Sequence, residues 1–383
     1  MKILFISHSS VIPTYREKLR LLAQHKNLEI TLLLPQFWPE AGKRVRTFDQ
    51  SSTKEGFRII SAPVLLEGRV KRHFYPFFSQ YVHQIKPDLI HIEEEPYSLV
   101  AWQAARATHK LGIPLVFFTW ENLLEQFPFP HQSIRKRVLQ SAAYAIAGDT
   151  EAAELLKKSD YPSKQISVIP QYGINPKLFI KKNVAKLKKE LKLGSFTVGY
   201  VGRLVPEKGL TDLLKAFAHL SSSTSTLLLV GNGPLRKELE EKAANLGIAE
   251  KIRWVPAVDQ PHIPDYLNCM DVLVLPSLTT PKWKEQFGRV LIEAQACEVP
   301  VVGSDSGAIP EVIGKAGLVY PEGNVSQLAA KLRRLKSSKA LSKKMRKMGR
   351  KQVLGLYTNQ IIADKLFKIY TAVSHFKKIN SNR

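Results

Sequence analysis

Short apolar segments rich in β-branched and aromatic residues recur along the chain, and stretches of helical character separate them. Near-continuous apolar runs suit parallel strands that helices cover on both faces. The alternation of the two patterns predicts an α/β doubly wound sheet, and the whole pattern occurs twice. The expected strands are KILFIS (2–7), LEITLLLP (28–35), PDLIHIE (87–93), IPLVFFT (113–119), AYAIAGD (143–149) and ISVIP (166–170), then FTVGYVG (196–202), TLLLVG (226–231), IRWVP (252–256), DVLVLPS (271–277) and VPVVGSD (299–305).

The two sets of strands are separated by a segment in which Pro, Gly and Asn cluster, IPQYGINPKLF. Such a cluster indicates a break between folded units, and we expect a hinge at Tyr172–Phe179. The predicted domains are residues 1–175 and 176–356, which would face each other across a cleft with ligands at the carboxyl ends of the strands. Apolar residues at helical spacing predict a last helix in 357–383, which is a candidate to pack back on either domain.

The 383 residues carry a net charge of +24, and most of it lies in the second half. Residues 1–180 contain 23 Lys and Arg against 16 Asp and Glu, which leaves +17 for residues 181–383. The run KLRRLKSSKALSKKMRKMGRK (331–351) has 11 basic residues and no acidic one. Such a field attracts phosphate groups. A solvated helix face, a membrane-binding surface and a nucleic-acid-binding surface all stay open as explanations.

The apolar runs and the cysteines indicate where the protein works. The first run, Ile3–Ile6, is too short for the core of a signal peptide, and no stretch of 18 apolar residues could span a bilayer. Cys269 and Cys297 are the only cysteines, too few for a disulfide framework or a thiolate zinc site. The expected location is therefore the reducing cytoplasm.

The loop after FTVGYVG contains two cations. Arg203 and Lys208 follow the strand end at Gly202 and precede a helix that begins near Leu210. A planar Arg fork and a compact Lys charge suit a diphosphate at the carboxyl edge of a sheet. The alternative is a pair of solvated loop cations.

A glycine-containing turn follows TLLLVG. Gly231 and Gly233 precede Pro234 and a helix. Glycine lets a backbone approach a ligand closely, and Pro suits the first turn of a helix. The turn lacks the third glycine of the dinucleotide-binding fingerprint, so a tight turn without a ligand is the commoner explanation.

The segment KEQFGRVLIEAQACEVP (284–300) carries Glu285 and Glu293. A helix is expected at 288–297, and the amides of 287–289 at its start suit a phosphate. If every intervening residue were helical, the glutamates would lie about 12 Å apart along the axis. That is longer than the roughly 5–9.5 Å between the carboxyl groups of a glycosidase. Two separate contacts on one long ligand are therefore more plausible than an acid–base pair.

Two expected strands in the first half end in carboxylates. Glu93–Glu95 follow one strand, and Glu121 with Asn122 follows another. Because strand carboxyl ends face the ligand side of such a sheet, at least one of these groups is a functional candidate. A solvated acidic turn is the alternative for Glu93–Glu95. His91 is expected to be a packed histidine within its strand.

Taken in order, these motifs resemble the retaining glycosyltransferases of family 4, which have the GT-B fold. The resemblance covers most of residues 195–325, and the tail LYTNQIIADKLFKIY is similar to the family's closing helix, which crosses back to the N-terminal domain. It implies two Rossmann-like domains and transfer of a sugar from a nucleotide-diphosphate sugar, with retention at the anomeric carbon and without a metal or cofactor. The motifs are GRLVPEKG (202–209), VGNGP (230–234), DVLVLPS (271–277), the E-x-F-G-x4-E segment (285–293) and SGAIPEVI (306–313).

The resemblance also implies roles for single residues. Arg203 and Lys208 match the family's diphosphate-binding cations, which neutralise charge on the leaving group. Glu285 matches the carboxylate that contacts the donor sugar, and Glu293 the one that hydrogen-bonds the nucleotide ribose. The other implied donor contacts are two glycine turns, the helix start and a segment next to the base: Gly202, Gly231, Gly233, Phe287, Gly288, Arg289 and Val258.

The first half departs from the family pattern at two positions. Many members have a glycine pair after the first strand, where this chain has only Ser7–Ser10, and a histidine after the strand that matches LVFFT, where this chain has TWEN. Glu121 aligns with that histidine, and whether Glu121 or Glu95 takes over its sugar contact stays open. The candidate acceptor contacts are Ser9, Glu95 and Arg72.

The segment GRVKRHFYPFFSQYVHQIK (68–86) mixes cations with five aromatic residues. On one helix, this mixture would fit a membrane interface with a lipid-linked acceptor. Packing of the aromatic residues in the core is the alternative. We therefore expect a glycan or lipid-linked acceptor from polysaccharide or glycolipid biosynthesis, and peripheral binding to the anionic inner face of the plasma membrane.

Two other classes of function stay open. The first is a nucleotide-sugar epimerase or a phosphorylase of the same two-domain architecture. The motif GRLVPEKG together with the segment that carries Glu285 and Glu293 argues against an epimerase. A phosphorylase would need a lysine that binds its cofactor, and a longer chain. A non-catalytic nucleotide or nucleic-acid binder would explain the charge of +24. It would not explain Glu285 and Glu293, because carboxylates repel a polyanion.

Overall fold

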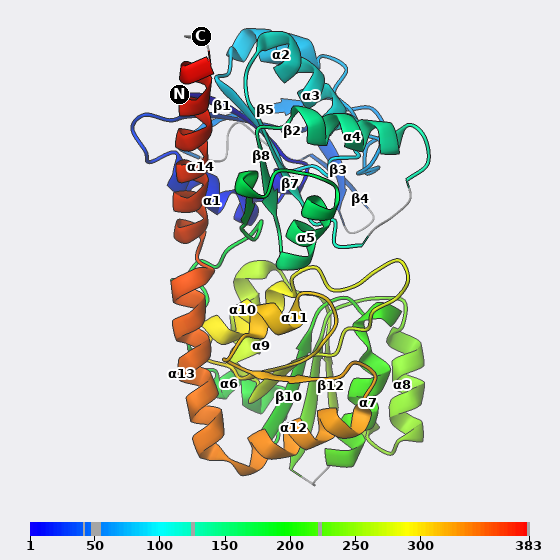
Figure 1. Cartoon of the computed structure of the whole chain (residues 1–383). Helices are drawn as coiled ribbons and strands as arrows, with labels where there is room; N and C mark the ends of the chain where they lie inside the picture. Colours follow the sequence, from blue (N-terminus) through cyan, green and yellow to red (C-terminus); the bar gives the residue numbers. More distant parts are fainter. Residues whose placement is uncertain (41–42, 47–54, 124–126, 221–223, 381–383) are drawn as a thin grey trace. The chain divides into compact units, whose positions relative to one another are not determined.

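The computed structural model describes residues 1–40, 43–46, 55–123, 127–220 and 224–380. The chain divides into unit 1, which is Met1–Gly173 with Asn359–Arg383, and unit 2, which is Ile174–Thr358. Each unit has one parallel sheet between layers of helices (Figure 1). The predicted α/β class with two Rossmann-like units is confirmed. Among the described residues, no helix combines the length and the apolar character that crossing a bilayer requires.

Unit 1 has a seven-stranded parallel sheet in the order β5-β2-β1-β6-β7-β8-β9. Successive side chains of a strand point to opposite faces. In β1, Leu4 and Ile6 therefore face one buried core, and Ile3 and Phe5 face the other. The strands are β1 (Lys2–Ile6), β2 (Glu29–Pro35), β5 (Arg58–Ala62), β6 (Leu89–Ile92), β7 (Leu115–Thr119), β8 (Tyr144–Ala147) and β9 (Ile166–Val168), beside the antiparallel pair β3 (Phe37–Glu40) and β4 (Lys43–Arg46).

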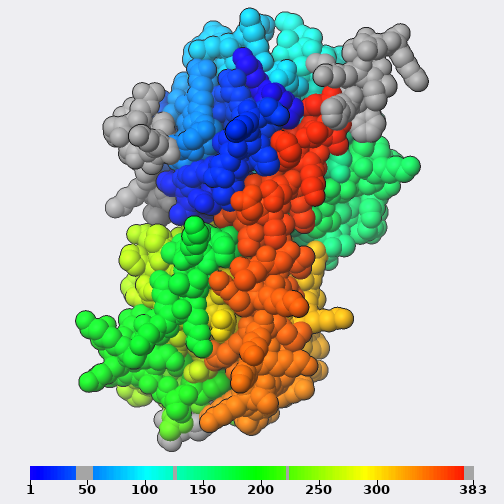
Figure 2. Space-filling view, turned by 90° about the vertical axis from the view of Figure 1, so that its left-hand side faces the viewer, coloured from blue at the N-terminus to red at the C-terminus, as the bar shows by residue number. Residues whose placement is uncertain are grey.

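Helices cover both faces of this sheet. The core that holds Leu4 also contains residues of α2, α3, α4 and α5, whereas the core that holds Phe5 contains residues of α1 and α14. Figure 2 shows α14, in red, against the N-terminal residues of the chain in blue. The helices are α1 (Glu17–Leu22), α2 (Phe78–Ile85), α3 (Leu99–Leu111), α4 (His131–Ser141), α5 (Thr150–Lys158) and α14 (Asn359–Asn380).

Unit 2 has a six-stranded parallel sheet in the order β12-β11-β10-β13-β14-β15. Every residue of β11, β13 and β14 is buried, as expected for strands that helices cover on both faces. The strands are β10 (Phe196–Val201), β11 (Ser225–Val230), β12 (Ile252–Val255), β13 (Val272–Leu275), β14 (Val301–Ser304) and β15 (Leu318–Tyr320). The helices are α6 (Ala185–Glu190), α7 (Leu210–Leu220), α8 (Arg236–Asn245), α9 (Ile263–Asn268), α10 (Arg289–Ala296), α11 (Ile309–Ile313), α12 (Val325–Ser337) and α13 (Lys339–Leu356).

The expectation of one basic and aromatic helix over residues 68–86 is wrong. α2 begins only at Phe78, and the segment before it makes an antiparallel bridge between Leu65 and Phe74. Tyr75 and Phe78 are buried in the core, whereas Phe77 is exposed. The aromatic residues therefore divide between the core and the surface.

Candidate functional site

A lysine–glutamate pair lies beyond the carboxyl ends of β10 and β13 in unit 2. The Lys208 Nζ is 2.5 Å from the Glu285 Oε2, and the Ser277 hydroxyl donates to the same oxygen at 2.7 Å. Glu285 is buried, with 7% exposure. A buried carboxylate needs such compensation, because its desolvation is otherwise costly. The structure thus brings the predicted residues Lys208 and Glu285 together, although 77 positions separate them in the sequence.

The backbone of Glu285 is held by the loop after β14. Its carbonyl oxygen accepts a hydrogen bond from the Ala308 N–H at 2.9 Å. Gly307, with φ +53°, lies so close that a Cβ there would be 2.1 Å from that oxygen. Glycine is therefore required at 307, and the loop after β14 fixes the position of Glu285, which lies in the loop before α10.

Arg203 lies in the loop between β10 and the short 3-10 helix Pro206–Lys208. Its carbonyl oxygen accepts a hydrogen bond from the Tyr200 hydroxyl at 2.7 Å, which fixes the backbone. The side chain is 70% exposed, with one guanidinium nitrogen 3.9 Å from the Glu207 carboxylate. The guanidinium can therefore reorient toward an anion from solvent.

The predicted glycines Gly202, Gly231 and Gly233 lie where two loops touch. A Cβ on Gly231 would be 1.9 Å from the Gly202 carbonyl oxygen, and one on Gly233 would be 2.2 Å from the Leu204 oxygen. The Leu204 N–H in turn donates to the Asn232 oxygen at 2.9 Å. These contacts explain the glycines by backbone packing, whether or not a ligand also approaches them.

The segment around α10 holds the second predicted glutamate. Gly288 is the N-cap with φ +69°, and Phe287 packs edge-on against Tyr357 at 5.8 Å between ring centroids. Glu293 is buried and forms an ion pair with the Arg289 Nε at 2.9 Å. Burial raises the pKa of Glu293, and the neighbouring Arg289 opposes that rise. Glu285 and Glu293 therefore have separate cationic partners.

Val258 lies in the loop after β12 and is half-buried. Four residues earlier, in β12, Trp254 has the Arg236 guanidinium over its ring at 4.0 Å from the centroid. Most of the predicted donor residues of unit 2 thus occupy loops that follow β10, β11, β12 and β13 at the carboxyl edge of the parallel sheet, whereas Arg289 and Glu293 lie in α10.

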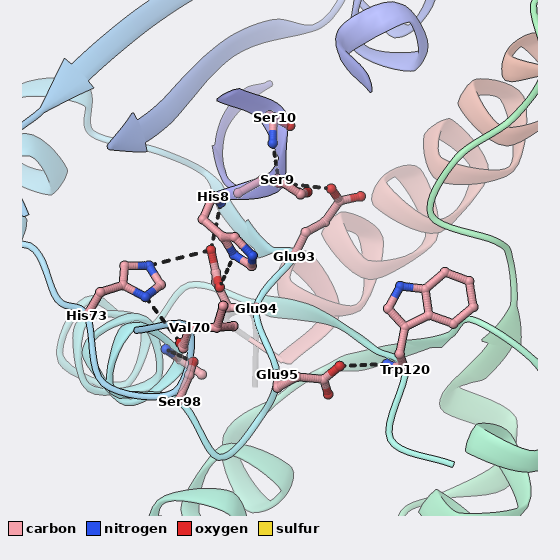
Figure 3. A network of polar contacts seen from close by, with 12 residues as sticks. His8, Ser9, Ser10, Val70, His73, Glu93, Glu94, Glu95, Ser98 and Trp120 are labelled. Carbon is pink, nitrogen blue, oxygen red and sulfur yellow. Dashed lines mark hydrogen bonds and ion pairs between the residues drawn. The ribbon is translucent and has the colours of Figure 1, made fainter. Parts of the chain in front are cut away.

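In unit 1, the three glutamates after β6 each have different partners (Figure 3). Glu93 pairs with the buried Lys18, and Glu94 accepts from the His8 Nδ1 at 2.6 Å. Glu95 accepts from the Thr119 hydroxyl at 2.6 Å and the Trp120 N–H at 2.9 Å. Because Glu93 and Glu94 are buried, the alternative of a solvated acidic turn is wrong. Burial raises the pKa of Glu95 to about 7.

The other unit 1 candidates are not all near these glutamates. Both carboxylate oxygens of Glu121 accept from the Arg135 Nε, at 3.0 and 2.9 Å. The Ser9 hydroxyl accepts from the Gln171 side-chain amide at 3.1 Å. Arg72 lies exposed on the loop that precedes α2. His91 is buried against Tyr370 of α14, and its prediction as a packed histidine is confirmed.

Sequence reasoning missed Ser277, His8 and His73. Ser277 stands within the DVLVLPS motif, directly after β13, and its strand-end position was the available signal. His8 follows β1 in the same way. His73 lies in an irregular segment, and its Nε2 is 3.8 Å from the Glu94 Oε1. No periodic pattern marks such a position, so only the fold reveals this contact.

Two family models match the chain. Glycosyltransferase Family 4 matches residues 16–176, and Glycosyl transferases group 1 matches residues 181–352. The chain belongs to the family 4 glycosyltransferases. One curated relative is a D-inositol 3-phosphate glycosyltransferase of Streptomyces bingchenggensis, 29% identical over 226 residues, or 55% of this chain and 49% of that protein. The capsular polysaccharide biosynthesis glycosyltransferase CapM of Staphylococcus aureus is 32% identical over 181 residues, or 46% of each chain.

The chain spans about half the length of these curated relatives. Solved structures match it over a longer range. HepE of Anabaena in complex with UDP matches with a TM-score of 0.78 and 20% identity, over 97% of this chain and 100% of that one. The lipopolysaccharide outer core galactosyltransferase WaaB matches with a TM-score of 0.67 and 18% identity, over 97% and 99%. These likenesses place the family 4 chain in the GT-B fold.

Proposed function

We propose that this family 4 protein is a retaining glycosyltransferase that moves a hexose-type sugar from a nucleotide-diphosphate sugar to a glycan or lipid-linked acceptor. The Lys208–Glu285 pair at the strand ends of unit 2 carries the proposal. A charged pair held beside glycine-containing loops at the carboxyl edge of a parallel sheet is typical of a ligand site in this class of fold. The family membership supports the same conclusion.

Unit 2 would hold the donor along one edge of its sheet. The Lys208 ammonium has three N–H donors, and one of them is used in the hydrogen bond to Glu285. The others, together with the exposed Arg203 guanidinium, can bind the diphosphate. Glu285 would contact the sugar hydroxyls, and Glu293 the ribose. The solved structure of HepE contains UDP, which supports a nucleoside diphosphate as the ligand of this fold.

In the proposed reaction, these residues position the donor and supply charges that stabilise the leaving group. The bond between the anomeric carbon and a diphosphate oxygen breaks, and the acceptor oxygen bonds to the anomeric carbon on the same face. The acceptor's proton passes to the departing diphosphate. Arg203 and Lys208 stabilise the negative charge on the leaving group, which is the electrostatic part of the catalysis. We propose that transfer requires neither metal nor cofactor at the donor.

Unit 1 would bind the acceptor, and we propose that Glu95 rather than Glu121 makes the sugar contact. Arg135 already binds both oxygens of Glu121. Glu95 is partly exposed, and among the described residues it accepts hydrogen bonds from the Thr119 hydroxyl and the Trp120 N–H. Ser9, on the neighbouring strand end, would assist. The net charge of +24 supports a cytoplasmic enzyme held peripherally on an anionic membrane surface. The similarity to CapM, a glycosyltransferase of capsular polysaccharide biosynthesis, supports a role in polysaccharide biosynthesis.

Donor turnover tests the proposal. The protein is incubated with UDP-, GDP- and ADP-sugars, and released nucleotide is measured. We expect release from at least one donor, with Lys208→Met lowering the rate about 100-fold, as for loss of one charge-stabilising group. Lys215→Met, at an exposed position of α7, is the matched control and should retain full activity. No release from any donor, combined with tight DNA binding, would replace the proposal with a non-catalytic binder.

A further inference from the structure

Three ligand-type side chains of unit 1 converge beside the strand ends, and the glycosyl transfer proposed above uses none of them. His8 follows β1, Glu94 follows β6, and His73 lies in the irregular segment before α2 (Figure 3). One ligand atom from each lies within 4.8 Å of the other two. His73 and Glu94 have side chains with no exposed surface, and the His8 side chain is 21% exposed.

The hydrogen bond on the far side of His73 fixes which ring nitrogen can act as a ligand. The His73 Nδ1 lies 3.1 Å from the Val70 carbonyl oxygen, which can only accept, so Nδ1 carries the proton. The Nε2 then presents a lone pair. It is buried and has no hydrogen-bond partner among the residues that the structure describes. A backbone carbonyl behind the ring is the usual support of a metal-binding histidine.

The lone pair of the His73 Nε2 faces an oxygen of Glu94 at 3.8 Å. Two acceptors in a dry site repel each other unless a cation or a proton lies between them. Among the described residues, Glu94 forms ion pairs only with His8 and His73, and with neither Lys nor Arg. Trp38 packs against both histidine rings, at 5.1 and 4.9 Å between centroids, and shields the cluster on one side.

We propose that His8, His73 and Glu94 bind one divalent first-row transition-metal ion, with Zn²⁺ as the reference case. Two imidazoles and one carboxylate form a set that Zn²⁺ accepts, with bonds of about 2.0–2.2 Å and a position left for water or a ligand. The half-buried His8 supplies the path of entry. Binding displaces the proton shared by the His8 Nδ1 and the Glu94 Oε2, and that proton passes to water.

The ion would link three segments that are distant in the sequence: the loop after β1, the segment before α2 and the loop after β6. It lies wholly in unit 1, so it needs neither the donor nor the diphosphate-binding cations. The inference is therefore independent of the proposed function, and the two can fail separately.

Metal binding to the full-length protein without an affinity tag tests the site. After chelator treatment and chelator removal, Zn²⁺ binding is measured by equilibrium dialysis with elemental analysis, and Co²⁺ binding by its visible absorption. We expect one equivalent, with a Co²⁺ spectrum of nitrogen and oxygen ligation. His73→Gln and Glu94→Gln should each weaken binding by more than the roughly 10- to 100-fold loss that follows a change next to a ligand.

His83→Gln is the matched control, because His83 lies exposed on α2, and its affinity for the metal should equal that of the wild type. Circular dichroism shows whether each variant is folded. If a buried variant does not fold, His8→Gln at the half-buried position takes its place, with the same expected loss. Absence of stoichiometric binding overturns the proposal, as does equal affinity in the wild type and in the folded variants.

Discussion

Lys18 and Glu93 form a buried ion pair in unit 1, with 1% and 3% of their side chains exposed. The Lys18 ammonium also donates to the Gln171 carbonyl at 2.6 Å. Removing one partner of such a pair leaves an uncompensated charge in the interior. We expect Lys18→Met to lower the free energy of unfolding by about 3–5 kcal/mol. Urea denaturation followed by circular dichroism measures it.

The exposed Lys26 provides the control for this prediction. Lys26→Met should change the free energy of unfolding by no more than about 0.5 kcal/mol. The double variant Lys18→Met/Glu93→Gln should regain part of the lost stability, because the buried charge is gone. A Lys18→Met protein as stable as the wild type would show that the hydrogen bonds from the Ser7 hydroxyl and the Gln171 amide, rather than Lys18, compensate Glu93.

At the residue scale, ion pairs between residues close in the sequence were predictable, and ion pairs between residues distant in the sequence were not. The spacing of Glu285 and Glu293 favoured two separate contacts, and in the structure the two glutamates form ion pairs with different cations. The Arg289–Glu293 pair is a local i,i+4 contact that helical geometry provides. The Lys208–Glu285 contact joins two loops of the sheet edge, and no local pattern encodes it.

At the scale of elements, the buried central strands were predictable, whereas two of the four edge strands of the parallel sheets were not. β1, β6, β7 and β13 are near-continuous apolar runs, which parallel strands require. β5 and β15 lie at sheet edges, are partly exposed, and were missed. The edge strands β9 and β12 were predicted, from the apolar segments ISVIP and IRWVP.

The close contact between the loops that follow β10 and β11 predicts that replacing Gly231 lowers the stability of the protein. Gly231 has φ +146°, and a Cβ there would be 1.9 Å from the Gly202 carbonyl oxygen. Gly231→Ala must displace that loop, so we expect a loss of about 1–3 kcal/mol in the free energy of unfolding. Thermal denaturation measures the change.

Gly355 of α13 is the matched glycine, because a Cβ there meets no atom within 4 Å. Gly355→Ala should leave stability unchanged or raise it by up to about 1 kcal/mol, since Ala favours a helix. If Gly231→Ala were as stable as Gly355→Ala, the close approach of the two loops would not be a real constraint.

At the scale of the whole molecule, the net charge of +24 leads to a prediction about membranes. Each surface cation adds about 1 kcal/mol to binding at an anionic bilayer, and salt screens the attraction. We expect flotation with anionic vesicles at low salt and release at high salt. Vesicles of zwitterionic lipid are the control, and no flotation with anionic vesicles at low salt would contradict peripheral association.

The basic run that the sequence marked divides between α12 and α13, which separate at Ser338. Lys343 and Lys344 are exposed on α13, whereas Arg69 and Arg72 are exposed in unit 1 before α2. Replacing Lys343 and Lys344 with Glu in one variant, and Arg69 and Arg72 with Glu in another, shows which of the two surfaces binds the vesicles, because flotation is lost when that surface is changed. The composition alone could not tell which surface binds the membrane, because it does not show which cations lie together on one face of the protein.

The account rests on a nucleoside diphosphate bound by the cations at the strand ends of unit 2. Calorimetric titration of UDP, GDP and ADP into the wild type and into the variant Arg203→Ala/Lys208→Met tests it without an acceptor. We predict that one of the three binds the wild type at least about 100-fold more tightly than the variant, since two charge-assisted contacts are lost. Equal affinity for the two proteins, or no binding to the wild type, would contradict the account.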